Sequence, residues 1–142
     1  MWKRRNCGTE IPAWADILID TSAWIEFFRK KEPWFSRMSD LLDRGRIISQ
    51  GIVIAGLLQG ATSDKELGII RDLANVLEMI GDDIQTWLEA GMLSNRLRKR
   101  GITVGLSDCL IACAAQGRGS AIMTMDAHFK SLKEELGIEL IS

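Results

Sequence analysis

The sequence predicts an α/β protein in which helices pack around a mostly parallel central sheet. Short apolar runs alternate with helical patterns along the chain, which is typical of parallel strands joined by crossover helices. Several of these runs are apolar at every position, as strands buried on both faces are. The 142 residues fit one domain, and we expect an N-terminal arm over residues 1–15 and a single domain over residues 16–142.

The apolar runs give the strands and the helical patterns between them give the helices. Strands are expected at residues 17–19, 46–48, 77–80, 121–124 and 138–141. In the first half, Thr21 and Ser22 are expected to cap a helix over 23–31, and Pro33 suits the first turn of the next helix, which Gly45 ends.

The later helices have their own start and stop signals. Ser49 opens a helix through residues 52–61, and Ser63 with Glu66 forms a capping box for another. An amphipathic helix is expected over 83–100, ended by Gly101, and a short one over 129–135. Ser107 is the expected cap of the segment DCLIACAAQG, which is apolar almost all round and should therefore be central and buried.

Composition excludes several classes of protein. Lysine and arginine total 18 against 19 acidic residues, so no global positive field draws the chain to nucleic acid or to an anionic membrane. Polyanion binding would need a local patch or metal ions. The odd cysteine count, Cys7, Cys109 and Cys113, indicates reduced thiols, and no long apolar stretch follows the basic residues near the start. We expect a cytoplasmic protein without membrane segments.

Three aspartates are the strongest candidates for chemistry. Asp20 ends the first strand, Asp126 follows the strand that ends at Thr124, and Asp108 lies in the first turn of the buried helix. The carboxyl ends of parallel strands form the reactive edge of such sheets, so these side chains can converge there. Clustered carboxylates need a cation to stay ionised together, and oxygen ligands favour Mg²⁺ or Mn²⁺. Singly, each aspartate is also explained as a helix cap, a helix-dipole partner or a turn residue.

Other candidates have a functional and a structural interpretation. The basic cluster of Arg96, Arg98, Lys99 and Arg100 either contacts a phosphate backbone or is a solvated helix end. His128, the only histidine, either contacts a phosphate or lies on the surface. Five aromatic residues within twelve positions form either a partner groove or part of the core: Trp24, Phe27, Phe28, Trp34 and Phe35.

Four segments, taken in order, resemble the PIN domain family, and more closely its VapC-type toxin ribonucleases. They are ILIDTSAWIEFFR, IAGLLQGA, LRKRGITVGLSDCLIACAA and TMDAHF, which together extend the resemblance over most of residues 17–141. The resemblance implies an α/β/α sandwich and Mg²⁺- or Mn²⁺-dependent cleavage of RNA. It assigns metal binding to Asp20, Asp108 and Asp126, with Thr21, Ser22 or Thr124 helping to position a water. It also implies a cognate antitoxin protein and a homodimer.

The chain departs from the family pattern at Gly56, where the usual residue is a fourth acid, a glutamate. Glycine is also unexpected on local grounds, because it costs a helix about 1 kcal/mol relative to alanine. Three explanations are open: a substitution that silences a toxic enzyme, which we favour, a natural degenerate copy, or tolerance because three aspartates suffice.

Two rival functions remain. A PIN fold that lacks one acid can serve as an RNA- or protein-binding module without catalysis. A phosphohydrolase of the haloacid dehalogenase type also places an aspartate after its first strand, but its second aspartate would fall on Ser22.

Overall fold

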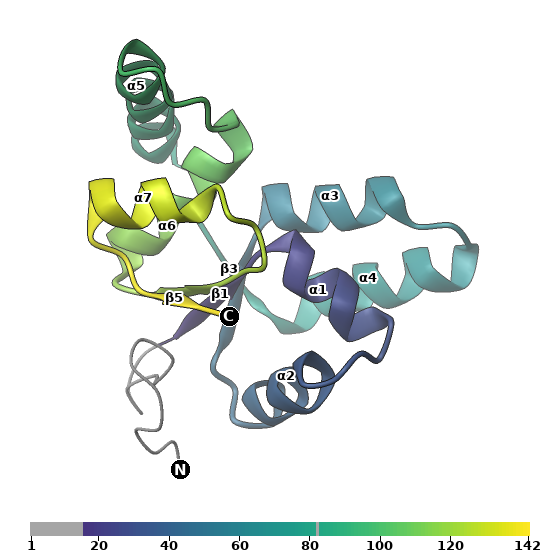
Figure 1. Cartoon of the computed structure of the whole chain (residues 1–142). Helices are drawn as coiled ribbons and strands as arrows, with labels where there is room; N and C mark the ends of the chain where they lie inside the picture. Colours follow the sequence, from purple (N-terminus) through teal and green to yellow (C-terminus); the bar gives the residue numbers. More distant parts are fainter. Residues whose placement is uncertain (1–15, 82) are drawn as a thin grey trace.

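The computed structural model describes residues 16–81 and 83–142, so the arm expected over residues 1–15, with Cys7, lies outside the described residues (Figure 1). Five strands form one sheet in the order β3-β2-β1-β4-β5, and every neighbouring pair is parallel. Their bounds are β1 Ile17–Ile19, β2 Ile47–Gln50, β3 Glu78–Ile80, β4 Ala121–Met123 and β5 Leu140–Ile141. The sheet is thus entirely parallel, where the sequence predicted only a mostly parallel one.

Seven helices surround the sheet in the described part of the chain. They are α1 Thr21–Phe28, α2 Trp34–Asp43, α3 Gly51–Gly60, α4 Asp64–Val76, α5 Ile84–Lys99, α6 Leu106–Arg118 and α7 Phe129–Leu136. They form two groups: α1 packs on α2 and α3, and α3 on α4, whereas α6 packs between α5 and α7. Figure 1 shows the first group on the right of the view and the second on the left. None of the helices over the described ranges is long and apolar enough to cross a bilayer.

The centre of the core is β1 together with α6. All three residues of β1 are fully buried, because a strand with neighbours on both sides and helices on both faces has no route to solvent. Seven consecutive residues of α6, Cys109–Ala115, are also buried. This confirms the expectation that the all-round apolar helix is central.

Three helix starts differ from the sequence prediction. The N-cap of α1 is Asp20 rather than Thr21 or Ser22, and its carboxylate accepts from the backbone N–H of Ser22. The negative charge of a carboxylate at this position also interacts favourably with the positive end of the helix dipole. Helix α6 begins after Gly105, and Ser107 lies inside its first turn.

The third difference concerns α3. Ser49 does not open this helix, because Ser49 and Gln50 continue β2 and pair with Met79 and Ile80 of β3. The helix therefore begins at Gly51, and Gly56 lies about one and a half turns into it.

The register of β1 against β4 brings the two chain halves together. Ile19 pairs with Met123, and the backbone N–H of Asp20 donates to the carbonyl of Met123 over 2.9 Å. The next residues along each strand, Asp20 and Thr124, therefore lie beside each other at the carboxyl edge of the sheet. This edge holds the candidate site.

Candidate active site

Asp20 is a buried carboxylate held by hydroxyl groups from both adjacent strand ends. Its side chain is only 5% exposed. Oδ2 accepts from Ser22 Oγ over 2.8 Å and from Thr124 Oγ1 over 2.9 Å, and the backbone N–H of Ser22 lies 3.4 Å away. Three donors converging on one carboxylate oxygen fix the Asp20 side chain in one orientation.

The same two hydroxyls hold the loop that follows β4. Ser22 Oγ accepts from the backbone N–H of Met125 over 3.0 Å, and Thr124 Oγ1 accepts from the backbone N–H of Asp126 over 3.0 Å. Each hydroxyl therefore donates to Asp20 and accepts from this loop. Ser22 and Thr124 position Asp126 relative to Asp20.

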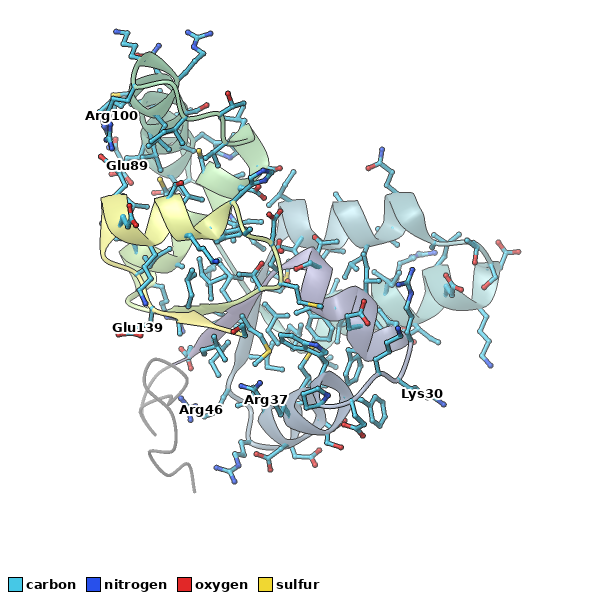
Figure 2. The ribbon with its side chains drawn as sticks, viewed as in Figure 1. Lys30, Arg37, Arg46, Glu89, Arg100 and Glu139 are labelled. Carbon is cyan, nitrogen blue, oxygen red and sulfur yellow. The ribbon has the colours of Figure 1, made fainter. Side chains whose placement is uncertain are left out.

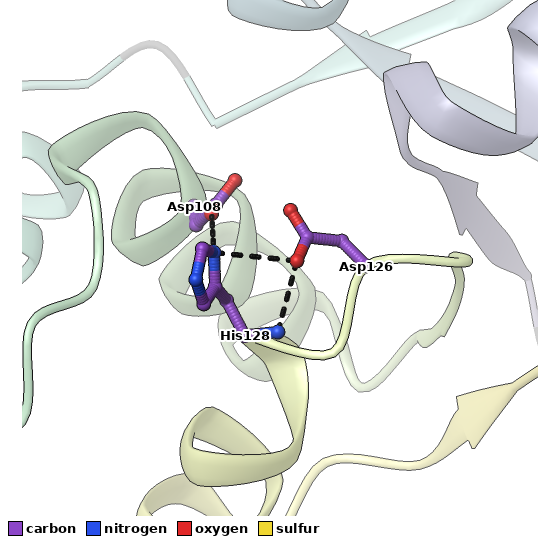
Figure 3. A group of neighbouring side chains, drawn as sticks. All are labelled: Asp108, Asp126 and His128. Atoms are coloured by element: carbon purple, nitrogen blue, oxygen red, sulfur yellow. Dashed lines mark hydrogen bonds and ion pairs between the residues drawn. The ribbon is translucent and has the colours of Figure 1, made fainter.

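Asp108, Asp126 and His128 form the second part of the site (Figure 3). Asp108 comes from the first turn of α6, and the other two residues come from the loop between β4 and α7. One ligand atom of each residue lies within 4.8 Å of the others, the only such grouping among the described residues. Nδ1 of His128 is 3.3 Å from Asp126 Oδ1 and 3.9 Å from Asp108 Oδ2.

The pKa of Asp108 reflects its burial and the charges of the other two aspartates. Burial, followed by the charges of Asp126 and Asp20, raises the pKa of Asp108 to about 6, and His128 acts in the opposite direction. Three carboxylates this close repel one another, and a bound cation would relieve the repulsion. The donor set of carboxylate oxygens and one imidazole nitrogen fits a divalent metal ion.

Position 56 faces this edge from the first group of helices. A Cβ added to Gly56 would lie 3.4 Å from Oγ1 and 3.8 Å from Cγ2 of Thr21, the residue that follows Asp20. These are ordinary van der Waals distances, and the backbone of Gly56 is helical. A side chain at position 56 can therefore be accommodated, and it would start beside the residue next to Asp20.

A pocket of about 410 Å³ adjoins Gly56. Helices α1, α3 and α4 enclose it, and Phe28, Arg29 and Ile70 contribute to its wall. Phe28 belongs to the aromatic group predicted from sequence. Within that group Trp24 is fully buried, whereas Phe27, Phe28, Trp34 and Phe35 are partly exposed.

The aromatic side chains pack on one another across α1 and α2. The Trp24 ring meets the Phe27 ring edge-on at 5.5 Å between centroids, and the Phe27 and Phe35 rings stack at 5.2 Å. The Arg37 guanidinium lies 5.8 Å from the centre of the Trp34 ring, and Figure 2 labels Arg37, which belongs to α2. Trp24 therefore belongs to the core, and Phe27, Phe28 and Trp34 are partly buried and pack against it.

The residues of the basic cluster at the end of α5 differ in their contacts. Arg100 forms a 2.6 Å ion pair with Glu135 of α7, and Arg96 lies 4.0 Å from the same carboxylate. Figure 2 shows Arg100 beside α5. Arg98 and Lys99 are exposed. Glu135 therefore neutralises part of the positive charge of this cluster, for which phosphate contact was one of the two interpretations.

Two residues, Ser22 and His128, make contacts in the structure that the sequence did not predict. The sequence predicts Ser22 as a helix cap and as one of three hydroxyls that position a water. Its bonds to Asp20 and to the loop after β4 depend on the pairing of distant strands. His128 was assigned to a phosphate contact or to the surface. The backbone N–H of His128 donates to Asp126 Oδ1 over 2.9 Å, and the two-residue spacing of Asp126 and His128 is typical of such an Asx-type turn.

Comparison with known proteins defines the class of this fold and site. Residues 17–135 match the PIN domain family. The chain therefore belongs to this family.

Within the family, its relatives are VapC ribonucleases. Ribonuclease VapC11 of Mycobacterium tuberculosis is 34% identical over 118 residues, which cover 80% of this chain and 88% of the relative. Ribonuclease VapC1 of Methanocaldococcus jannaschii is 28% identical, with 83% of this chain and 82% of the relative covered. The chain is of the VapC type, as its sequence motifs indicated.

Solved structures confirm the fold. VapBC2 from Rickettsia felis, bound to a DNA fragment from its promoter, matches with a TM-score of 0.69 at 20% identity, covering 87% of this chain and 96% of the other. DNA-bound VapBC from Salmonella typhimurium matches with a TM-score of 0.67 at 23% identity, covering 89% and 96%.

Proposed function

We propose that the chain is a divalent-metal-dependent endoribonuclease, the toxin of a toxin–antitoxin pair that acts on RNA in the cytoplasm. One observation supports the proposal: in a PIN domain of the VapC type, ligand atoms of Asp108 and Asp126 lie within 4.8 Å of each other, and the charge of Asp20 also acts on Asp108. Burial, and then the charges of Asp126 and Asp20, raise the pKa of Asp108, and carboxylates perturbed in this way are common at functional sites.

Each residue has a distinct part in this proposal. Asp20, Asp108 and Asp126 would hold one or two Mg²⁺ or Mn²⁺ ions. When bound, such an ion supplies charge stabilisation for the phosphodiester and lowers the pKa of water. Ser22 and Thr124 keep Asp20 oriented through their hydroxyl donors. The same two hydroxyls hold the loop after β4 beside the end of β1, so Asp126 keeps its position relative to Asp20.

The missing carboxylate at Gly56 lowers the activity expected of this chain. Position 56 lies next to Thr21, where a glutamate would extend toward the carboxyl edge. Without that fourth acid we expect weak metal binding and slow cleavage. This feature also favours the second candidate function, a PIN-like module that binds RNA or protein without cutting.

Partners follow from the relatives. The matched structures are VapBC complexes, and we propose that this chain likewise binds a cognate antitoxin and pairs with a second copy of itself. The partly buried aromatic residues of α1 and α2 and the pocket beside Gly56 form the proposed partner groove. The exposed Arg98 and Lys99 are the proposed RNA contacts.

The test is cleavage of a labelled single-stranded RNA with Mn²⁺, with Mg²⁺ and with EDTA. We expect slow cleavage that requires the metal and is lost in an Asp20→Asn/Asp126→Asn double variant. Asp72→Asn, an exposed aspartate of α4, is the matched control and should cleave normally. Calorimetric titration with Mn²⁺ should show weak binding that the double variant loses. Metal-dependent RNA binding without cleavage would favour the binding module instead.

A further inference from the structure

We propose that His128 is a direct nitrogen ligand of the cation held by Asp108 and Asp126, and that it makes this site prefer Mn²⁺ over Mg²⁺. The inference rests on the proposed function, because it names a further ligand of the same site. It concerns a residue that the three-aspartate assignment leaves out.

The geometry places the imidazole where a ligand is needed. Nδ1 of His128 points toward the two carboxylates, at 3.3 Å from Asp126 Oδ1 and 3.9 Å from Asp108 Oδ2 (Figure 3). Ligand bonds to divalent ions are about 2.0–2.5 Å long, so atoms that share an ion lie roughly 3–5 Å apart. The three ligand atoms, all within 4.8 Å of one another, fall in that range.

The position of His128 is fixed by its backbone and not by core packing. Its N–H donates to Asp126 Oδ1, and the residue is the N-cap of α7, which Phe129 begins with a fully buried side chain. The His128 side chain itself is 62% exposed. The ring is thus free to adjust by rotation while its Cα stays beside the two aspartates.

The kinds of ligand atom at the site determine which metal ion it binds more tightly. Gly56 supplies no carboxylate, so the site has fewer oxygen donors than the family pattern provides. An imidazole compensates with a nitrogen donor, which transition ions such as Mn²⁺ accept more readily than Mg²⁺ does.

Pulsed electron paramagnetic resonance of Mn²⁺ bound to the untagged protein tests the ligand directly. A coordinated imidazole modulates the electron spin echo through its ¹⁴N nucleus. Because His128 is the only histidine, labelling with ¹⁵N-histidine must change the modulation if this ring binds the ion. We expect modulation in the unmodified chain and in Lys130→Ala, an exposed control on α7, and none in His128→Ala.

Calorimetry supplies the second readout. The Mn²⁺ affinity should fall about 10-fold in His128→Ala, the size of effect seen when support of a metal site is removed. The Mg²⁺ affinity should change less than about twofold, since this ion gains little from the nitrogen donor. Circular dichroism checks that the variant keeps its helices.

The outcomes separate this inference from the proposed function. Bound Mn²⁺ without ¹⁴N modulation, or unchanged Mn²⁺ affinity in His128→Ala, overturns the role of His128 while metal-dependent cleavage stands. If no Mn²⁺ binds and no RNA is cut in the presence of metal, the proposed function fails and this inference fails with it.

Discussion

Thr124 Oγ1 donates to Asp20 Oδ2 over 2.9 Å, a bond between the ends of two strands that lie 104 residues apart in the chain. Asp20 is buried, so each donor to its carboxylate replaces a water that the site excludes. The same Thr124 oxygen accepts from the N–H of Asp126. One hydroxyl therefore links the orientation of two of the three carboxylates.

Thr124→Val removes this hydroxyl and keeps the shape of the side chain. The buried carboxylate loses a charge-assisted bond, so we expect the free energy of unfolding to fall by about 2 kcal/mol. Mn²⁺ binding should weaken as well. Chemical denaturation and calorimetry measure the two effects, with Thr103→Val, an exposed loop position, as the control. Equal stability of Thr124→Val and Thr103→Val would contradict the role assigned to the bond.

Gly56→Glu should raise metal-dependent RNA cleavage roughly 10- to 100-fold, the range typical of restored support at a metal site. A side chain at position 56 starts beside Thr21 without backbone strain, and replacing glycine favours the helix by up to about 1 kcal/mol. The added carboxylate increases repulsion without metal, so cleavage should depend more steeply on Mg²⁺ or Mn²⁺. In cells the variant should be toxic unless an antitoxin is present.

Gly56→Gln is the matched control for this change. It has nearly the same shape and also favours the helix, but it carries no charge. Cleavage of labelled RNA at equal protein concentration compares the three chains, with EDTA as the blank. If the glutamate variant is no faster than the glutamine variant, position 56 is not the place of the missing acid.

Asp108→Asn should stabilise the metal-free protein at neutral pH. Burial and then the charges of Asp126 and Asp20 raise the pKa of Asp108 to about 6, so the folded chain holds this proton more tightly than the unfolded chain. The stability that the proton bound to Asp108 gives to the fold is therefore complete below about pH 4, the usual aspartate range. It is lost as the pH rises through 6.

At pH 7 the variant should gain about 1 kcal/mol after allowance for solvent screening, or roughly 3 °C in Tm. Thermal unfolding at pH 4 and pH 7, with and without Mn²⁺, measures the effect. We expect the difference between the two chains to shrink at pH 4. Added Mn²⁺ should raise the Tm of the unmodified chain more than that of Asp108→Asn. A destabilised Asp108→Asn at pH 7 would contradict the repulsion inferred at this site.

The two thiols of α6 should be unreactive in the folded protein. Burial, followed by the charges of Glu89 and Cys109, raises the pKa of Cys113 to about 11, and burial also raises the pKa of Cys109. At pH 8 the thiolate fraction of Cys113 is then at least about 100-fold below that of a free cysteine. Reaction with a chromogenic disulfide in a Cys7→Ser variant should be slow until denaturant is added. Rapid labelling under native conditions would show that α6 is less buried than described.

Removing the two exposed cations of α5 should weaken RNA binding. An Arg98→Ala/Lys99→Ala variant loses up to two phosphate contacts, so the slope of log affinity against log salt should decrease by about 1–2. Lys65→Ala/Arg71→Ala on α4 is the control, since it removes the same charge from exposed positions away from α5. Binding is measured by fluorescence anisotropy in EDTA. Equal losses in the two variants would mean that only net charge matters.

The aspartates could be predicted from the sequence because strand ends are visible in it. Ile17–Ile19 is an unbroken apolar run, so the place of Asp20 at the carboxyl edge follows from the parallel sheet. The burial of α6 followed from its all-round apolar pattern. These features depend on periodicity and burial, which each segment displays by itself.

Features that depend on distant pairing were harder to predict. Ser49 looked like a helix cap, but pairing with β3 extends β2 through Gln50. The ion pair of Arg100 with Glu135 joins α5 to α7, which are separate in the sequence. The orientation of the His128 ring depends on α6 lying opposite the loop after β4, and no local pattern contains that information.

The placement of β4 beside β1 determines when during synthesis the site can exist. Asp20 is synthesised 104 residues before its hydroxyl donor Thr124, and Asp126 follows two residues after that. Domains emerge N-terminus first, and the centre of this sheet stays incomplete until its fourth strand arrives. A nascent chain that has not yet reached β4 therefore has no assembled carboxylate cluster, and the first strand with its aspartate waits for a partner made about a hundred residues later.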